Sequence, residues 1–340
     1  LERRRERGPA YDELVDEFVD AVKEMFPQAL LQLEDFGNCN AFRLLEKYRG
    51  ALCLFDDDIQ GTGAVALSGL LAALRISKGA LEKQRVLFFG AGQAGIGIGN
   101  TMVAAMVADG TPIEQARGNC WFFDSQGLLV DGRADLPQQK RPYSHKHPPV
   151  ADLAEAVRLL QPTALVGCAG QAGVFTQEVV ELMAAQQQRP IIFALSNPTA
   201  KAECTAEQAY QWSEGRAIFA SGSPFEPVHL GSKTFVPGQG NNAYIFPGVG
   251  LGAVCSQSRE VTDGMFLAAA RVLADLVSDE DLDLGRVYPR LSHIRHVSAQ
   301  IAAEVAGIAY REGLAQREAP DDILEDVRQH MFQPLYPHYA

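Results

Sequence analysis

The sequence predicts an α/β protein whose main part is a doubly wound parallel sheet. From Thr62 onward, apolar strand-like runs such as "RVLFFG", "CWFFD", "ALVGCAG" and "PIIFALS" alternate with helical patterns. Such alternation requires right-handed crossovers, which cover both faces of a parallel sheet with helices. A glycine-rich turn follows the first of these runs. The 340 residues exceed the usual size of one domain, so we expect a second one.

The elements follow from local patterns. Apolar residues recur at helical spacing in residues 11–26, and Pro27 follows them. Two short apolar runs, 29–33 and 51–55, predict strands that each end in carboxylates, with a helix between them. Further helices are expected from Thr62 and over Gln93–Ala108, 152–160, 177–187, 263–277 and 293–310, and a short strand over 217–221. Residues 240–252 are expected to be loop-rich.

Composition excludes several classes of protein. The net charge is -12 and no stretch concentrates Lys and Arg, so no nucleic-acid partner is expected. The apolar stretches look too short to cross a bilayer, so no membrane partner is expected either. Six scattered cysteines without a C-x-x-C pair indicate buried thiols in a reducing compartment. We therefore expect a cytoplasmic protein. The alternative is an organelle matrix, because the sequence does not begin with Met and is expected to start partway through a longer protein.

The glycine-rich turn predicts dinucleotide binding. Gly90, Gly92 and Gly95 form G-x-G-x-x-G between a predicted strand and a predicted helix, as in Rossmann-type domains. Gln93 and Ala94 complete the turn, which would place a pyrophosphate at the helix amino terminus. The alternative is a tight turn with no ligand.

The end of the next strand predicts which dinucleotide binds. Asp124 is expected on the adenosine ribose, although it comes later than the usual spacing of about 20 residues and could be a turn aspartate. A carboxylate there favours NAD, whereas Ser125, Lys140 and Arg141 could bind the 2′-phosphate of NADP. The two basic residues could equally be solvated loop charges.

Carboxylates cluster after the first two predicted strands. Glu34 and Asp35 follow one strand, and Asp56, Asp57 and Asp58 follow the other. Carboxylates brought together repel unless they are protonated or bind a cation, and oxygen ligands favour Mg²⁺ or Mn²⁺. The alternative is that they are turn and N-cap residues.

Four long motifs resemble the malic enzyme family. They are "LEDFGNCNAFRLLEKYR", "CLFDDDIQGTGAVALSGLLAAL", "ALSNPTAKAECTAEQAY" and "FVPGQGNNAYIFPG", and the similarity runs from about Tyr11 to about Gly313. The resemblance implies oxidative decarboxylation of L-malate to pyruvate and CO₂ by a homodimer or homotetramer. The helical pattern after residue 262 is similar to the helical opening of the chain, so we expect the two ends to pack together. They would form a discontinuous metal and substrate domain (1–58 and 243–319) around a dinucleotide-binding domain (59–242), and residues 320–340 are expected to be a polar tail of no assigned function.

The resemblance also assigns roles to individual residues. It implies Glu34, Asp35 and Asp58 as metal ligands and Asp57 as a catalytic aspartate that pairs with a lysine, while Asp56 stands where the family more often has Asn. Asn197 and Asn242 correspond to residues near the nicotinamide and the malate carboxylate, and both could otherwise be turn formers. Thr62, Asn38 and the second glycine loop, "GCAGQAG", correspond to cofactor positions. Ser125 and Lys140 resemble the NADP-dependent branch.

Three functions stay open on this basis. The family's tyrosine acid, lysine base and substrate-binding arginine come from motifs that this sequence does not contain, so the chain alone could be inactive. The first function is the malic enzyme reaction, and the second is malolactic conversion of malate to lactate, which the NADP-type lysine disfavours. The third is a dinucleotide- and metal-binding module without turnover.

Overall fold

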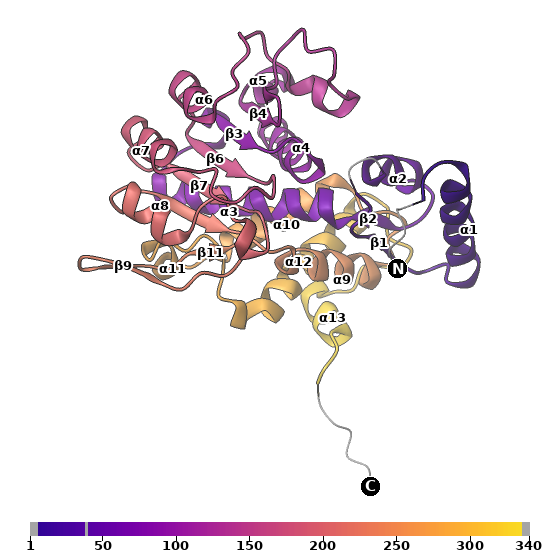
Figure 1. Ribbon diagram of the computed structural model, residues 1–340. Helices are drawn as coiled ribbons and strands as arrows, with labels where there is room; N and C mark the ends of the chain where they lie inside the picture. The colour runs from indigo at the N-terminus through magenta and orange to yellow at the C-terminus, as the bar shows by residue number, and fades with distance from the viewer. Residues whose placement is uncertain (1–5, 38–39, 335–340) are drawn as a thin grey trace.

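The central sheet of the protein is mostly parallel and has helices on both faces (Figure 1). The computed structural model describes residues 6–37 and 40–334. The strand order is β11-β8-β7-β6-β3-β4-β5, and every neighbouring pair is parallel except β4 with β5. The strands are β3 (Val86–Phe89), β4 (Cys120–Asp124), β5 (Gly127–Leu128), β6 (Ala164–Gly167), β7 (Ile191–Ala194), β8 (Ile218–Ser221) and β11 (Gly238–Gln239). The predicted doubly wound sheet is confirmed.

Helices cover the two faces with separate apolar clusters. One cluster packs the sheet against α3 (Thr62–Ser77), α4 (Gln93–Ala108), α9 (Phe246–Ser256), α10 (Asp263–Asp275) and α12 (Ile294–Arg311). The other packs it against α6 (Leu153–Leu160), α7 (Gln177–Gln186) and α8 (Ala206–Trp212). Short elements complete this part: α5 (Ile113–Gly118), α11 (Asp279–Asp283) and the hairpin of β9 (Val228–Leu230) and β10 (Lys233–Phe235).

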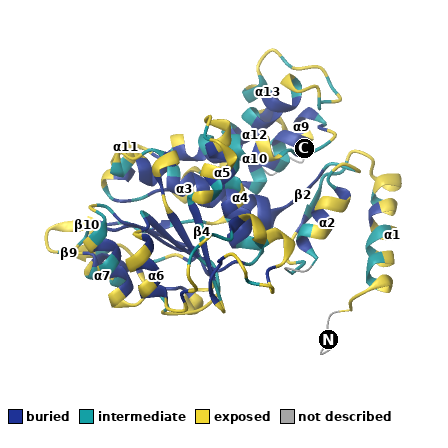
Figure 2. Ribbon diagram, turned by 90° about the horizontal axis from the view of Figure 1, so that it is seen from above, coloured by how far each residue is buried: buried dark blue, intermediate teal, exposed yellow. Residues whose placement is uncertain are grey.

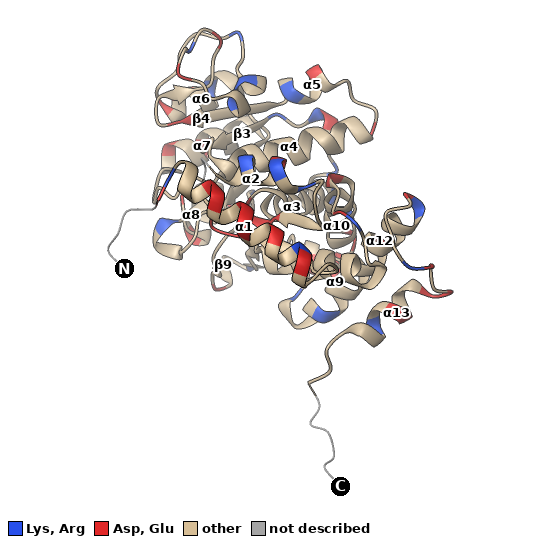
Figure 3. Cartoon of the chain, turned by 90° about the vertical axis from the view of Figure 1, so that its right-hand side faces the viewer, with Lys and Arg blue, Asp and Glu red and all other residues tan. Residues whose placement is uncertain are grey.

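The amino-terminal residues form a small unit beside the main sheet. Strands β1 (Leu31–Leu33) and β2 (Leu54–Asp56) pair in parallel, and α1 (Pro9–Met25) and α2 (Ala41–Tyr48) pack around them in a separate apolar cluster. The acidic side of α1, visible in Figure 3, is tied to α2 by ion pairs of Arg43 with Asp12 (2.7 Å) and Lys47 with Asp16 (2.5 Å). Figure 2 shows how much more exposed α1 is than the central strands.

Two expectations need correction. The region expected to be loop-rich contains α9, whose glycines at positions 248 and 252 let it pack closely on α12. The supposed polar tail contains α13 (Ile323–His330), which is anchored on α9 and α12 by the fully buried Val327. The two ends of the chain do pack together: Phe55 of β2 lies in the same apolar cluster as α9, α10 and α12 and meets Phe266 of α10 edge to face (ring centroids 5.5 Å). An Arg49–Asp263 ion pair (3.1 Å) also links α10 to the amino-terminal unit. The division into domains stays a prediction.

One apolar helix is longer than the sequence suggested. Asp57–Ser77 is continuous, has a mean hydropathy of 1.4 over its most apolar window and, among the described helices, alone has the length and composition to cross a membrane. However, 78% of that window is buried inside the protein, as expected for a core helix. Its packing partners are α4 and α10.

Candidate functional site

The two parallel strands of the amino-terminal unit bring the predicted acids to one edge. Leu33 pairs with Asp56, so the residues that follow both strands leave the small sheet side by side. The backbone N–H of Asp35 donates a hydrogen bond to Asp58 Oδ2 (2.7 Å). Asp35 itself has a left-handed backbone (φ 58°), which turns the chain sharply after Glu34. The predicted neighbourhood of the two acidic segments is therefore present.

The aspartate triplet lies at the start of a helix that begins with a π-helical turn, Asp57–Gly61. Asp56 caps this turn by accepting a hydrogen bond from the N–H of Ile59 (3.1 Å), and its own N–H donates to Gln60 Oε1 (3.0 Å). Asp56 therefore shapes the turn and leaves Asp57 and Asp58 to face the cavity described next. Such single π-turns are frequent at functional sites.

A cavity of about 470 Å³ lies between this turn and the carboxyl ends of β6 and β7. We call it the carboxylate cavity. Three acids line it, Glu34, Asp57 and Asp58, together with Asn197 and Lys201. Its remaining described lining residues are Thr62, Val65, Ala94, Cys168, Gly170, Leu195, Ser196, Gly240, Asn241, Asn242 and Phe246.

Asp57 is bound to Asn242, which comes from the far end of the chain. The amide nitrogen of Asn242 donates to Asp57 Oδ2 (3.1 Å), to the Asp57 carbonyl (3.1 Å) and to Thr62 Oγ1 (3.0 Å). Within the residues that the structure describes, no lysine forms an ion pair with Asp57, so the lysine partner that the resemblance implies is not seen. Asn242 and Thr62 therefore orient Asp57 in addition to lining the cavity.

The electrostatics of the cavity disfavour ionised acids. Burial raises the pKa of Asp57 to about 7, the Asn242 hydrogen bond opposes this rise, and the charges of Glu34 and Asp58 add to it. The pKa of Glu34 is raised by burial and then by the charges of Asp58 and Asp35. Burial likewise raises the pKa of Asp56 to about 7. Mutually repelling carboxylates of this kind bind protons or a cation.

The acids fit a hard divalent cation in their chemistry. Their donors are all oxygens, and Asp57 Oδ1 is buried without a hydrogen-bond partner in the described structure, so it has an unused acceptor. In the described part of the chain, however, no three His, Cys, Asp or Glu side chains converge as a finished metal centre. Of the three predicted ligands, Glu34 and Asp58 line the carboxylate cavity, and Asp35 is not among its lining residues.

A second cavity, of about 380 Å³, surrounds the glycine-rich turn. We call it the glycine cavity. β4 lies on one side of β3, and β6, the next parallel strand along the chain, lies on the other side, so the strand order reverses at β3. The glycine cavity lies at this reversal, which is where open α/β sheets bind ligands. Gly90, Gly92 and Gln93 line it together with Asp124 and Lys140, whereas Ala94 lines the neighbouring carboxylate cavity. Cys168 lines both, so the two cavities adjoin.

The glycines of the turn are required by their surroundings. Gly90 has a left-handed backbone (φ 122°) and lies against the backbone of Cys168 and Ala169. A Cβ at Gly95 would lie 2.1 Å from the carbonyl oxygen of Gly90. This closeness brings the start of α4, with its free N–H groups, directly under the turn, an arrangement suited to an anion.

The predicted ribose aspartate is neutralised by two cations. Arg133 donates two hydrogen bonds to Asp124 (2.9 and 3.1 Å), and Lys140 Nζ lies 2.9 Å from its Oδ2. Burial acts to raise the pKa of Asp124, but these two partners hold it below its ordinary value. Ser125 lines the glycine cavity beside them. Lys140 is therefore not a solvated loop charge, and sequence reasoning missed Arg133, which has no motif of its own.

The other predicted residues are placed as follows. Asn197 lines the carboxylate cavity and is exposed, near the start of the loop after β7. Asn38 lies outside the described residues. Lys201, the one lysine or arginine among the described residues that line this cavity, was not predicted, although its position four residues after Asn197 in the same motif could have suggested it.

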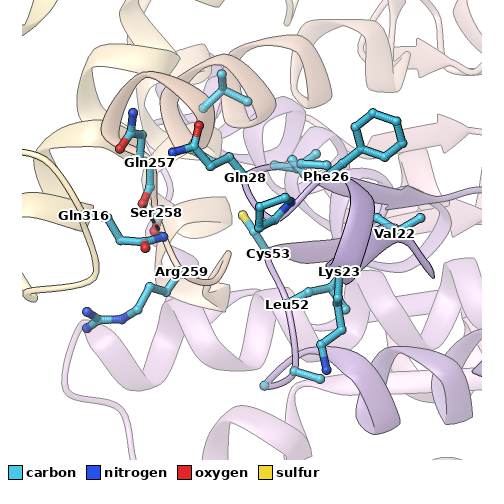
Figure 4. Close-up of a pocket in the computed structure, with 17 residues that line it drawn as sticks. Val22, Lys23, Phe26, Gln28, Leu52, Cys53, Gln257, Ser258, Arg259 and Gln316 are labelled. Carbon is cyan, nitrogen blue, oxygen red and sulfur yellow. Dashed lines mark hydrogen bonds between the residues drawn. The ribbon is translucent and has the colours of Figure 1, made fainter. Parts of the chain in front are cut away.

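A further cavity, of about 350 Å³, lies away from all the predicted residues. It is enclosed by the end of α1, the loop before β1, the segment before β2 and the end of α9 (Figure 4). Lys23, Cys53 and Arg259 are among its lining side chains. None of the predicted acids, glycines or asparagines lines it.

The fold and the glycine cavity define a class of protein, those with a doubly wound dinucleotide-binding domain. Residues 59–310 match the model of the malic enzyme NAD binding domain, and residues 1–49 match that of the malic enzyme N-terminal domain. The chain belongs to the malic enzyme family.

Individual relatives agree with this assignment. The chain is 49% identical over 344 residues to the NADP-dependent malic enzyme, chloroplastic, of Zea mays, a match that covers 100% of the chain and 54% of the relative. It is 52% identical over 317 residues to an NADP-dependent malic enzyme of Homo sapiens, covering 93% of the chain and 55% of the relative. The solved malic enzyme of Entamoeba histolytica superposes with a TM-score of 0.76 at 26% identity, covering 93% of this chain and 62% of that chain.

The relatives differ from this chain in length and from one another in compartment. The chain spans little more than half the length of the two curated relatives named above. The names of relatives include a chloroplastic and a mitochondrial enzyme, so membership of the family does not determine the compartment, and a cytoplasmic location is not confirmed.

Proposed function

We propose that this chain supplies the NADP- and metal-binding part of a malic enzyme, which converts L-malate and NADP⁺ to pyruvate, CO₂ and NADPH. The observation that carries the proposal is the junction of the glycine cavity and the carboxylate cavity at Cys168. A nicotinamide bound across that junction would lie beside the acids, as hydride transfer from a metal-bound hydroxy acid requires.

The proposed reaction balances without another reactant. The hydroxyl-bearing carbon loses a hydride to NADP⁺, and its hydroxyl proton passes to a base. The bond between the adjacent methylene carbon and its own carboxylate then breaks as CO₂ leaves, and the electron pair of that bond forms the enolate of pyruvate. The proton held by the base returns to this methylene carbon. The two electrons of the hydride are the only ones exchanged.

Glu34, Asp35 and Asp58 would hold Mg²⁺ or Mn²⁺. When bound, such an ion would polarise the keto oxygen as a Lewis acid. Asp57 would hold or move a proton near the substrate hydroxyl, with Asn242 and Thr62 fixing its orientation. Asn197 and Lys201 line the same cavity, where an amide and an ammonium suit a carboxylate of malate.

Lys140 is expected to determine the preference for NADP. The ion pairs to Arg133 and Lys140 cancel the charge by which Asp124 would repel a 2′-phosphate. We expect Lys140→Ala to weaken NADPH binding about tenfold, which corresponds to about 1.4 kcal/mol, and to leave NADH binding within twofold. Titration of the reduced-nicotinamide fluorescence measures both. The exposed Lys146→Ala serves as the control, and equal losses for the two cofactors would show that the lysine is structural.

The proposed reaction is tested by an assay of two proteins. One is the 340-residue chain, and the other is a fusion that places the amino-terminal part of the human relative before Leu1. Each receives L-malate, Mn²⁺ and NADP⁺ or NAD⁺, and reduced nicotinamide is followed by absorbance. We expect the fusion to reduce NADP⁺ and the chain alone to be slower by about 10²–10⁴-fold, because its sequence does not contain the motifs of the family's tyrosine acid and lysine base. A fusion that binds NADPH without turnover would leave only a binding module, and lactate among the products would contradict oxidative decarboxylation.

Association is a separate part of the proposal. We propose that the protein acts as a homodimer or homotetramer with L-malate as its small-molecule partner, without nucleic acid or a membrane. Light scattering after size-exclusion chromatography measures the oligomeric state, and a monomer at all concentrations would contradict it.

A further inference from the structure

We propose that Glu203 is a positioning residue that holds together the two loops facing the nicotinamide. These are the loop after β6, residues 168–173, and the loop after β7, residues 195–203. The inference rests on the proposed function, because only a bound nicotinamide and substrate would make the relative position of the loops matter for turnover.

Glu203 is an acid in an unusual place. Its exposed fraction is 0%, and in the described part of the structure no lysine, arginine or histidine forms an ion pair with it. An unpaired carboxyl in such a site is costly unless hydrogen bonds satisfy it. Burial accordingly raises the pKa of Glu203, and hydrogen bonds from Ser196 and the backbone lower it in part. Such a group is retained at a cost to stability, which points to a specific role.

The carboxyl joins the two loops through Ser196. The hydroxyl of Ser196 donates a short hydrogen bond to Glu203 Oε1, and its backbone N–H donates to Oε2 (3.3 Å). The hydroxyl oxygen of Ser196 in turn accepts a hydrogen bond from the N–H of Gly170 (2.8 Å). A continuous chain of hydrogen bonds therefore runs from the second glycine loop to the buried acid.

The backbone beside Glu203 adds two further links. The carbonyl of Glu203 accepts from the N–H of Phe175 (3.0 Å), and that of Ala202 accepts from the N–H of Gly173 (3.2 Å). The side chain also packs directly against the end of β6: a Cβ at Gly167 would lie 2.4 Å from Cδ of Glu203 and 2.8 Å from its Oε1. The Glu203 carboxyl therefore fits at the end of β6 only because residue 167 is a glycine.

Both linked loops line the carboxylate cavity. Cys168 and Gly170 come from one of them, and Ser196, Asn197 and Lys201 come from the other. Glu203 does not line the cavity, so it acts through Ser196, the immediate neighbour of Asn197. A misplacement of about 1 Å in such positioning groups can reduce a rate about 100-fold.

The test compares three variants with a matched control. Glu203→Ala removes the link, Ser196→Ala removes its middle member, and Glu203→Gln keeps a hydrogen-bonding group of the same shape. Asp281→Ala is the control, because Asp281 is also a buried acid that accepts a hydrogen bond from a serine, Ser278, but does not line either cavity. Amide hydrogen exchange of the 340-residue chain and kcat and KM of the fusion are measured for each.

We expect amides of residues 168–173 and 195–203 to exchange at least about tenfold faster in Glu203→Ala and Ser196→Ala, with no change in α10. The kcat of the fusion should fall about 10–100-fold with KM for malate within threefold, and Glu203→Gln should recover most of both losses. Unchanged exchange in the two loops, or an equal fall of kcat in Asp281→Ala, would overturn the proposal. A wild-type fusion without turnover would count against the proposed function alone, since the exchange measurement decides the linkage of the loops by itself.

Discussion

The Asp58→Ala variant is expected to bind Mn²⁺ roughly 100-fold more weakly than the wild-type chain. Asp58 and Glu34 line one cavity, and burial followed by the charge of Asp58 raises the pKa of Glu34, so the two carboxyls are held together at an energetic cost. Removing one carboxylate removes both a ligand and part of that field. Titration of free Mn²⁺ by electron paramagnetic resonance measures the affinity directly and requires no turnover.

Two controls separate the loss of a ligand from damage to the fold. Asp58→Asn keeps an acceptor for the N–H of Asp35 and should lose Mn²⁺ binding almost as strongly, because the charge is gone. In metal-free buffer this variant should be at least as stable as the wild type, since repulsion with Glu34 is relieved. The exposed Asp109→Ala, whose carboxylate pairs with Arg271, should bind Mn²⁺ normally. Wild-type affinity in Asp58→Asn would instead identify the acids as turn and N-cap residues.

The Gly95→Ala variant is expected to lose dinucleotide binding and about 3 kcal/mol of its free energy of unfolding. The added Cβ would lie 2.1 Å from the carbonyl oxygen of Gly90 and 3.0 Å from Sγ of Cys168, and a backbone carbonyl within a tight turn cannot move aside easily. The turn and the start of α4 would separate, and the N–H groups would no longer face the glycine cavity. Urea unfolding and NADPH fluorescence measure the two effects.

Gly250→Ala provides the matched control for this substitution. Gly250 lies inside α9, and an added Cβ meets no heavy atom within 4 Å. Alanine favours the helix by about 1 kcal/mol over glycine, so this variant should be slightly more stable and should bind NADPH as the wild type does. If Gly95→Ala bound NADPH with unchanged affinity, the glycine-rich turn would not be the dinucleotide site.

Local pattern was sufficient to predict most of the elements. The helix predicted over Gln93–Ala108 has those bounds in the structure, and the strands around "VLFF", "CWFFD" and "IIFA" lie in the predicted parallel sheet. Periodicity was less informative for α9, because its buried glycines leave no apolar stripe. It was also less informative for α13, where a largely polar sequence is anchored by the buried Val327 with Ile323 and Leu324 beside it. These two helices are stabilised by tertiary packing, which the apolar periodicity of their sequences does not reveal.

The sequence by itself determined the doubly wound fold, the glycine-rich turn and the two acidic segments, because each depends on spacing within a few neighbouring residues. Only the tertiary structure decided how distant residues combine. It brought Asn242 into a hydrogen bond with Asp57, Arg133 and Lys140 into hydrogen bonds with Asp124, and Ser196 into a hydrogen bond with Glu203. The physical reason is that the charge state and orientation of a buried polar group depend on partners brought to it by chain crossovers, and no local spacing encodes them.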